Sequence, residues 1–138
     1  MSVAIENLIP HRAPMRFIDV LTECTETTAV ATACFREDSF AVANGFVSET
    51  ALVECVAQTV AAALGQRAKN SDQSDSEIAA KGMLVSVSNF KIQSPPPAGK
   101  TLRIEVRELK RLGLMLRVVG EISCDGEIIA AGELTLYE

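Results

Sequence analysis

Glu54 is the side chain in this sequence best placed to do chemistry. It lies inside an otherwise apolar run from Val47 to Ala68, and Gln58 follows four residues later, on the same face if the run is helical. A carboxylate among valines costs several kcal/mol unless it is paired or lines a cavity. A positioned carboxylate can act as a general acid or base. We therefore expect Glu54 to be catalytic; the alternative is a buried glutamate held by a backbone group or an arginine.

His11 and Asn44 are further candidates. His11 is the only histidine, and Pro10 and Pro14 bracket its segment. Histidine is the natural base near neutral pH, but a histidine between prolines is more typical of a structural role. Asn44 either orients substrate or water, or adopts a left-handed backbone before Gly45. One histidine and scattered cysteines do not make metal-ligand spacing, and there is no P-loop or dinucleotide fingerprint, so we expect neither metal nor cofactor.

The run that carries Glu54 predicts one long central helix, from Thr50 to Ala68. Apolar residues recur at helical spacing on one face, and the opposite face is apolar as well. The two faces comprise Val53, Val56, Ala57, Val60 and Leu64, and Ala51, Cys55, Ala62 and Ala63. Ser48 is the expected N-cap. A helix that is apolar nearly all round is expected to be buried.

Alternating and β-branched segments on both sides of the helix predict six strands. They are Met15–Cys24, Thr27–Phe35, Gly82–Ile92, Thr101–Leu109, Leu114–Ser123 and Glu127–Tyr137. A slip in the apolar phase near Ser88-Asn89 predicts a β-bulge, and Asp125-Gly126 predicts a tight hairpin. We expect a short helix or turn at residues 3–9, an irregular stretch at 40–46 and a mobile polar loop at 70–81.

Two strands, one long apolar helix and four further strands indicate an α+β fold. Six antiparallel strands wrapped around one central helix match the hotdog architecture, and residues 1–138 are expected to form a single domain. One twisted sheet should cover only part of the helix. We therefore expect a homodimer or a higher homo-oligomer.

Composition excludes several classes of function. With 48% hydrophobic and 22% charged residues, the chain has the composition of an ordinary soluble globular protein. A net charge of -5, with no basic cluster interleaved with aromatics, argues against nucleic acid as a partner. No apolar run is long enough for a membrane span, and the N-terminus lacks a signal-peptide pattern. The four cysteines form no close pair, so free thiols in a cytoplasmic protein are expected.

Three segments resemble one enzyme family. The stretches LIPHRAPMRFIDVL (Leu8 to Leu21), VECVAQ (Val53 to Gln58) and LRIEV (Leu102 to Val106) are similar to 3-hydroxyacyl-acyl-carrier-protein dehydratases. The pattern is nearest to the aryl-polyene-pathway dehydratase-like branch. In that branch a valine stands seven residues before the helix glutamate, as Val47 does before Glu54.

The resemblance implies a dimeric hotdog enzyme with active sites at the subunit interface. A loop histidine would remove the C2 proton of the acyl thioester, and a helix carboxylate would help the 3-hydroxyl leave as water. By this resemblance Glu54 is the carboxylate, the Glu49 amide polarises the thioester carbonyl, and Gln58 supports Glu54 in the substrate site.

The sequence departs from the family pattern at the loop histidine. That histidine should fall near Ala43-Asn44, where the sequence has none, and Glu49 replaces the family's glycine at the helix start. The missing base leaves three options: His11 enters the site, Glu54 carries both proton transfers, or a partner chain supplies the base. On the sequence alone we expect weak or absent dehydratase activity from the homo-oligomer.

Three functions therefore remain open. The first is dehydration of 3-hydroxyacyl groups carried by acyl carrier protein or coenzyme A, in fatty-acid or polyene biosynthesis. The second is thioester hydrolysis, with Glu54 activating water. The third is a non-catalytic subunit of a hotdog heterodimer. Four cations either receive a carrier's phosphate or belong to a solvated sheet face: Arg103, Arg107, Lys110 and Arg111.

Overall fold

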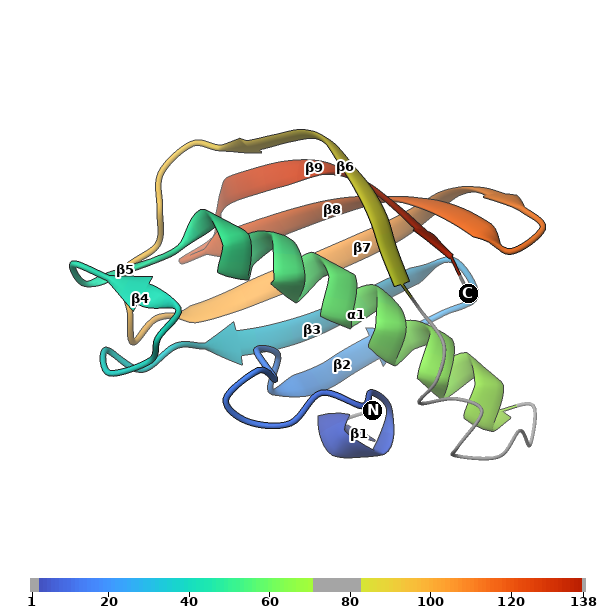
Figure 1. The fold of residues 1–138 in the computed structure, drawn as a ribbon, viewed down its shortest axis with the longest axis horizontal. Coiled ribbons are helices and arrows are strands. Elements are labelled where there is room, and N and C mark those ends of the chain that lie inside the picture. The colour runs from blue at the N-terminus through green and yellow to red at the C-terminus, as the bar shows by residue number, and fades with distance from the viewer. Residues whose placement is uncertain (1–2, 71–82, 138) are drawn as a thin grey trace.

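The computed structural model describes residues 3–70 and 83–137, and places one long helix inside a curled antiparallel sheet (Figure 1). The helix α1 spans Glu49–Asn70, and a short 3-10 helix, η1, spans Ile5–Asn7. The strands are β1 (Val3–Ala4), β2 (Val20–Cys24), β3 (Thr28–Cys34), β4 (Val42–Ala43), β5 (Phe46–Val47), β6 (Met83–Ile92), β7 (Thr101–Leu112), β8 (Met115–Cys124) and β9 (Glu127–Tyr137). The predicted α+β hotdog architecture, with six long antiparallel strands around one helix, is confirmed.

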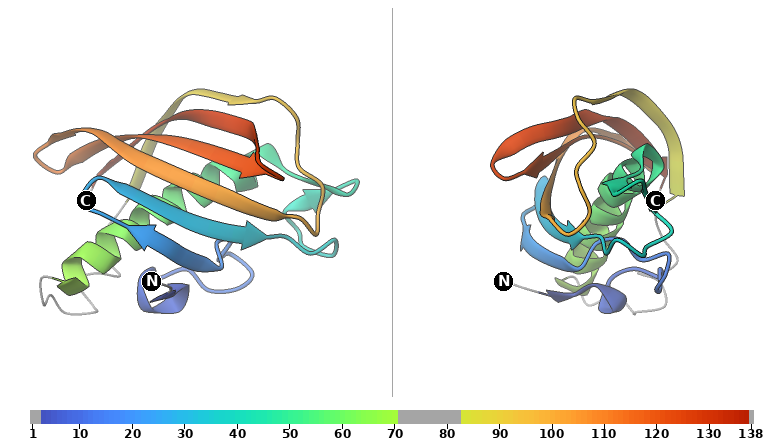
Figure 2. Two further views of the ribbon diagram at one scale, coloured as in Figure 1. Left: turned by 180° about the vertical axis from the view of Figure 1, so that it is seen from behind. Right: turned by 90° about the vertical axis from the view of Figure 1, so that its left-hand side faces the viewer.

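The strand order within the described residues is β1-β2-β3-β7-β8-β9-β6, and all neighbouring pairs are antiparallel. Strands β7, β8 and β9 follow one another through short turns, whereas β6 pairs with β9 at one edge. Figure 2 shows the sheet curling around α1, with the helix axis inside the curl. Alternate residues of the long strands therefore point at the helix, as in the buried Leu102, Ile104 and Val106 of β7.

Strand β2 is shorter than predicted, because it begins at Val20 and not at Met15. The Phe17 N–H donates to the Gln58 side chain at 2.8 Å, and the Met15 carbonyl accepts from the same side chain at 2.9 Å. These backbone groups are therefore satisfied by the helix and not by a neighbouring strand. Local sequence could not reveal a partner more than 40 positions away.

Two short pairings were not predicted. Strand β1 adds two residues to the edge of the sheet beside β2. Strands β4 and β5 form a separate two-stranded ribbon in the stretch expected to be irregular. Asn44 and Gly45 form its turn with φ of 54° and 83°, the left-handed backbone that a tight hairpin requires.

The predicted central helix is confirmed, with ends at Glu49 and Asn70. Its N-cap is Ser48, whose Oγ accepts the Ala51 N–H at 3.3 Å. Twelve of its 22 residues are buried. The other ten are partly or fully exposed, so one sheet covers only part of α1, and a second subunit stays a prediction.

The local irregularities of the sheet follow the sequence signals. The register of β6 against β9 shifts between Ser88 and Lys91, and Asn89 has φ of 53°, which confirms the predicted bulge. Asp125 and Gly126 have φ of 52° and 83°, as a two-residue hairpin requires. The loop expected at residues 70–81 falls, apart from Asn70 at the end of α1, outside the described residues. No helix within the described ranges has the length and apolar content of a membrane span.

Candidate active site

Gln58 joins the N-terminal segment to the middle of α1. Its carboxamide oxygen accepts the Phe17 N–H at 2.8 Å and the Ile18 N–H at 3.4 Å. Its amide nitrogen donates to the Met15 carbonyl at 2.9 Å and to Glu54 Oε1 at 3.2 Å. The side chain is only 1% exposed, so water does not compete for these bonds. Gln58 therefore fixes the irregular segment before β2 and the orientation of the Glu54 carboxylate together.

His11 approaches the same carboxylate oxygen from the N-terminal segment. Its Nε2 lies 3.4 Å from Glu54 Oε1, and each of the two side chains is 32% exposed. Its Nδ1 is buried and has no hydrogen-bond partner among the described residues. Proton exchange between this ring and the pocket must therefore pass through Nε2, the nitrogen that faces Glu54. The structure thus brings together the two residues that the sequence could not connect.

Two arginines hold the segment that carries His11. Arg12 Nη1 donates to the carbonyls of Ile9 and His11, each at 2.8 Å, and its Nη2 donates to the Glu6 carbonyl at 3.0 Å. Arg16 Nε lies at ion-pair distance from the Glu6 carboxylate, 3.1 Å, without hydrogen-bond geometry. Arg16 Nη1 also donates to the Ile18 carbonyl at 3.0 Å. The two arginines therefore stabilise a backbone path between η1 and β2 that no strand pairing fixes.

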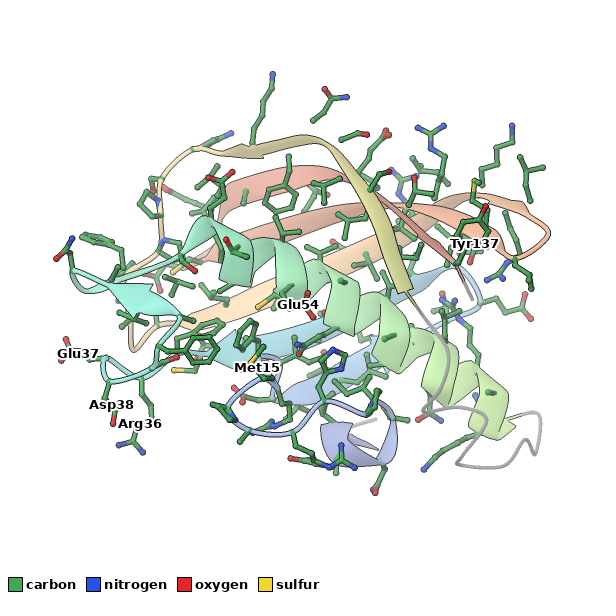
Figure 3. The ribbon with its side chains drawn as sticks, viewed as in Figure 1. Met15, Arg36, Glu37, Asp38, Glu54 and Tyr137 are labelled. Atoms are coloured by element: carbon green, nitrogen blue, oxygen red, sulfur yellow. The ribbon has the colours of Figure 1, made fainter. Side chains whose placement is uncertain are left out.

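A pocket of about 370 Å³ opens beside the His11–Glu54 pair. Its lining consists of His11, Met15, Phe17, Phe40, Ala41, Ser48, Thr50, Ala51 and Glu54. Figure 3 shows Met15 reaching from the N-terminal loop toward α1, on the side where Glu54 points out of the helix. The Phe17 and Phe40 rings lie 5.9 Å apart between centroids and form part of an apolar wall. The pocket therefore offers an apolar space with one acid–base pair at its side, the arrangement expected for a small-molecule site.

The first turn of α1 borders the same pocket through Ser48, Thr50 and Ala51. Ser48 caps the Ala51 N–H, whereas the N–H groups of Glu49 and Thr50 have no backbone or side-chain acceptor among the described residues. Unpaired N–H groups at a helix start attract an anionic oxygen, aided by the helix dipole. The Glu49 side chain is exposed and does not line the pocket. Any role of Glu49 in binding a carbonyl oxygen is therefore limited to its backbone N–H.

Asn44 lies apart from the pocket. It occupies the exposed β4–β5 turn, and its left-handed φ of 54° accounts for an asparagine at this position. Its side chain is not among the residues that line the pocket. A role for Asn44 in binding substrate therefore receives no support from this geometry.

Cys55, the neighbour of Glu54 in α1, is fully buried. Burial, followed by the charges of Glu54 and Asp19, raises the pKa of this thiol far above its usual range. A protonated, buried thiol is not a nucleophile. Among the described residues, no three His, Cys, Asp or Glu side chains gather as a possible metal site.

The sequence singled out the polar members of the site but missed its apolar wall. Met15, Phe17 and Phe40 belong to short irregular segments, and only their position just after Pro14 or before the helix start could have indicated a lining role. Arg103, Arg107 and Lys110 of β7 lie elsewhere, on the outer face of the sheet, whereas Arg111 pairs with Glu108 at 3.1 Å. Arg103, for example, pairs with Glu105 at 3.3 Å and with Glu23 at 3.8 Å.

Comparisons with known proteins agree with this architecture. Residues 3–138 match the model of the ApeP-like family, described as ApeP dehydratase. No curated protein matches the chain. Among solved structures, the dehydratase heterocomplex ApeI:P from Xenorhabdus doucetiae superposes with a TM-score of 0.88 at 23% identity, covering 99% of this chain and 91% of that one. Zebra fish thioesterase superfamily member 2 superposes with a TM-score of 0.67 at 13% identity, covering 89% and 82%. At these identities the two structures establish the fold alone, whereas the family match confirms the resemblance found in the sequence.

Proposed function

The chain belongs to the ApeP-like dehydratase family, and on that premise we propose that it removes water from 3-hydroxyacyl thioesters. The substrate is proposed to arrive on an acyl carrier protein, during fatty-acid or polyene biosynthesis in the cytoplasm, with coenzyme A as the alternative carrier. One observation carries the proposal: His11 Nε2 lies 3.4 Å from Glu54 Oε1 at the side of an apolar pocket. Dehydration needs a base and an acid within reach of adjacent carbons, and this pair supplies both.

The proposed roles follow from which atoms face the pocket. His11 Nε2 removes the proton from C2 of the thioester while protonated Glu54 donates its proton to the leaving 3-hydroxyl. The C2–H electron pair forms the new double bond, the C3–O bond breaks, and water leaves. The site is then an imidazolium beside a carboxylate. A proton that passes from Nε2 to Oε1 across 3.4 Å restores the starting state without help from solvent.

The helix start is the proposed site of the thioester carbonyl. The N–H groups of Glu49 and Thr50 would stabilise the negative charge that develops on the carbonyl oxygen when C2 loses its proton. The acyl chain would then lie along Met15, Phe17 and Phe40. Gln58 is proposed to orient the substrate-facing carboxylate, since its own side chain is buried and bonds only to the protein.

The family's loop histidine is absent from this sequence, and the His11–Glu54 pair offers a replacement for it as the base. Its position favours His11 as the base over proton transfer by Glu54 alone. A second subunit remains part of the proposal, either as a homodimer or as a hotdog heterodimer. The similar fold of a chain from a dehydratase heterocomplex supports including the heterodimer.

The test is turnover of a 3-hydroxyacyl-carrier substrate, followed by the enoyl absorbance, with free-thiol release measured in parallel. We expect enoyl product from the wild type, and a loss of at least ~10²-fold in both His11→Ala and Glu54→Gln, the usual size of a general acid–base contribution. The matched control Glu127→Gln removes an exposed carboxylate outside the pocket and should retain full activity.

The other outcomes identify the alternatives. Thiol release without enoyl product would replace the dehydratase proposal with a thioesterase that uses Glu54. Brisk turnover that survives His11→Ala would leave Glu54 or a water to perform both transfers. A wild type that is inert alone, yet active with a second hotdog protein, would assign the base to the partner chain. Melting curves of each variant separate lost chemistry from lost folding.

A further inference from the structure

Apolar side chains are exposed at the tip of the β7–β8 hairpin, far from the pocket. Leu112 is 60% exposed, Leu114 is 63% exposed and Tyr137 of β9 is 43% exposed. The register aligns Leu112 with Met115, and Met115 with Tyr137, so that these side chains form one row across three strands on the outer face of the sheet. Contiguous exposed apolar side chains of this kind usually mark an interaction surface. We call this row and Leu114 the hairpin tip.

Cations stand directly behind the hairpin tip on the same face. The next row pairs Lys110 with Arg117, and the row after that contains Arg107. Arg117 is engaged with Glu133 at 2.7 Å, whereas Lys110 and Arg107 are exposed and have no ion-pair partner among the described residues. The whole chain carries a net charge of -5, so this excess of positive charge at one end is a local feature.

The hairpin tip projects at one end of the molecule. Figures 1 and 2 show the β7–β8 turn at the opposite end of the long axis from the β4–β5 ribbon. The pocket lies near that ribbon, since Phe40, Ala41 and Ser48 line it. Figure 3 places Tyr137 at the hairpin end, well separated from Met15. A partner bound at the hairpin tip would therefore leave the pocket entrance open.

We propose that the hairpin tip docks the protein on the surface of an anionic lipid membrane. The order of the side chains suits a membrane–water interface. The leucines and Met115 at the turn would enter the apolar layer, and Lys110 and Arg107 would lie at the depth of the lipid headgroups. Tyr137, with an apolar ring and a polar hydroxyl, suits the boundary between the layers. Long basic side chains beside anionic lipids add electrostatic attraction. This inference does not rest on the proposed catalytic function.

An acidic protein is the alternative partner, and the shape of the surface argues against it. A stable protein interface needs roughly 800 Å² on each side, and a surface of that size would have to include much more than one turn. The exposed leucines flank Gly113 at the extremity of a single projecting hairpin. A small apolar hairpin tip next to exposed cations is better suited to insertion into a lipid surface than to a broad protein interface.

The test uses vesicles, with the single tyrosine as a local reporter. The chain has one Tyr and no Trp, so tyrosine fluorescence reports on the hairpin tip alone. We expect the full chain to sediment with vesicles of equal parts phosphatidylglycerol and phosphatidylcholine, and much less with phosphatidylcholine alone. Acrylamide quenching of Tyr137 should fall when the anionic vesicles are added. High salt should weaken the binding, because it screens the cations.

Two variants and one control decide the outcome. Leu112→Ser with Leu114→Ser should lower the vesicle partition coefficient by at least about tenfold, and Lys110→Glu should lower it several-fold. The control Ile128→Ser changes an apolar residue of similar exposure, 48%, near the far turn of the sheet, and should bind as the wild type does. The proposal is overturned if the wild type does not sediment with anionic vesicles, or if the folded tip variants have the same vesicle partition coefficient as the wild type.

Discussion

At the scale of single residues, Gln58 links the two halves of the candidate site. It contacts Glu54 on its own helix and the backbone of Met15 and Phe17 on the segment that carries His11. The distance between His11 and Glu54 thus depends on a buried amide that touches neither the pocket nor the imidazole. The resemblance suggested that Gln58 supports Glu54, but its bonds to the N-terminal segment join residues more than 40 positions apart and leave no local pattern in the sequence.

Replacing this amide should weaken both stability and catalysis. Gln58→Ala leaves the buried Phe17 N–H without its acceptor, so we expect the free energy of unfolding to fall by about 2–4 kcal/mol. Turnover should fall even where the variant is folded, because the His11 segment is no longer held against α1. Denaturant unfolding and kcat measured on one preparation test both parts.

The matched control is Gln66→Ala, which removes a glutamine of the same helix that bonds to Asn70 at 3.0 Å near the helix end. We expect its stability to change by less than about 0.5 kcal/mol. If Gln58→Ala and Gln66→Ala behave alike, Gln58 has no special positioning role.

At the scale of elements, the sequence was most informative where a structure depends on neighbouring residues. The Asp125-Gly126 hairpin, the bulge near Ser88-Asn89 and the apolar helix were all predicted, because each is encoded by local backbone or burial preferences. The start of β2 and the β4–β5 ribbon were not predicted. The first depends on a distant side chain, and the second depends on a turn signal in a stretch with little alternation.

Close packing at glycine positions provides an element-scale prediction. A Cβ at Gly132 of β9 would lie 2.5 Å from the Cα of Phe90, on the bulged part of β6. Backbone at that distance has to move, so Gly132→Ala should lower the free energy of unfolding by about 1–3 kcal/mol, the usual cost of overpacking. Thermal unfolding would measure the loss. Thr135→Ala, on the outer face of the same strand, is the control and should stay within about 0.5 kcal/mol of the wild type.

At the scale of the whole molecule, the pocket entrance is a surface where large apolar side chains are exposed and could be buried by a second subunit. Met15 and Phe40 line the pocket and are 54% and 63% exposed, and Phe46 of the nearby β5 is 47% exposed. The β4–β5 ribbon, which contains Phe46, lies at the opposite end from the β7–β8 turn (Figure 1). A second subunit that covers these apolar side chains would enclose the pocket and exclude water from the acid–base pair, which strengthens the electrostatic interactions inside.

This argument predicts a dimer assembled through the pocket end. Light scattering at micromolar concentration should give a mass near twice 14.8 kDa. Phe46→Asp places a charge on the proposed interface without changing a residue that lines the pocket, and should shift the equilibrium toward monomer. Leu114→Ser, at the far end, should leave the mass unchanged while it weakens vesicle binding. A wild type that remains at 14.8 kDa would contradict the homodimer, and a dimer that both variants leave intact would place the interface elsewhere.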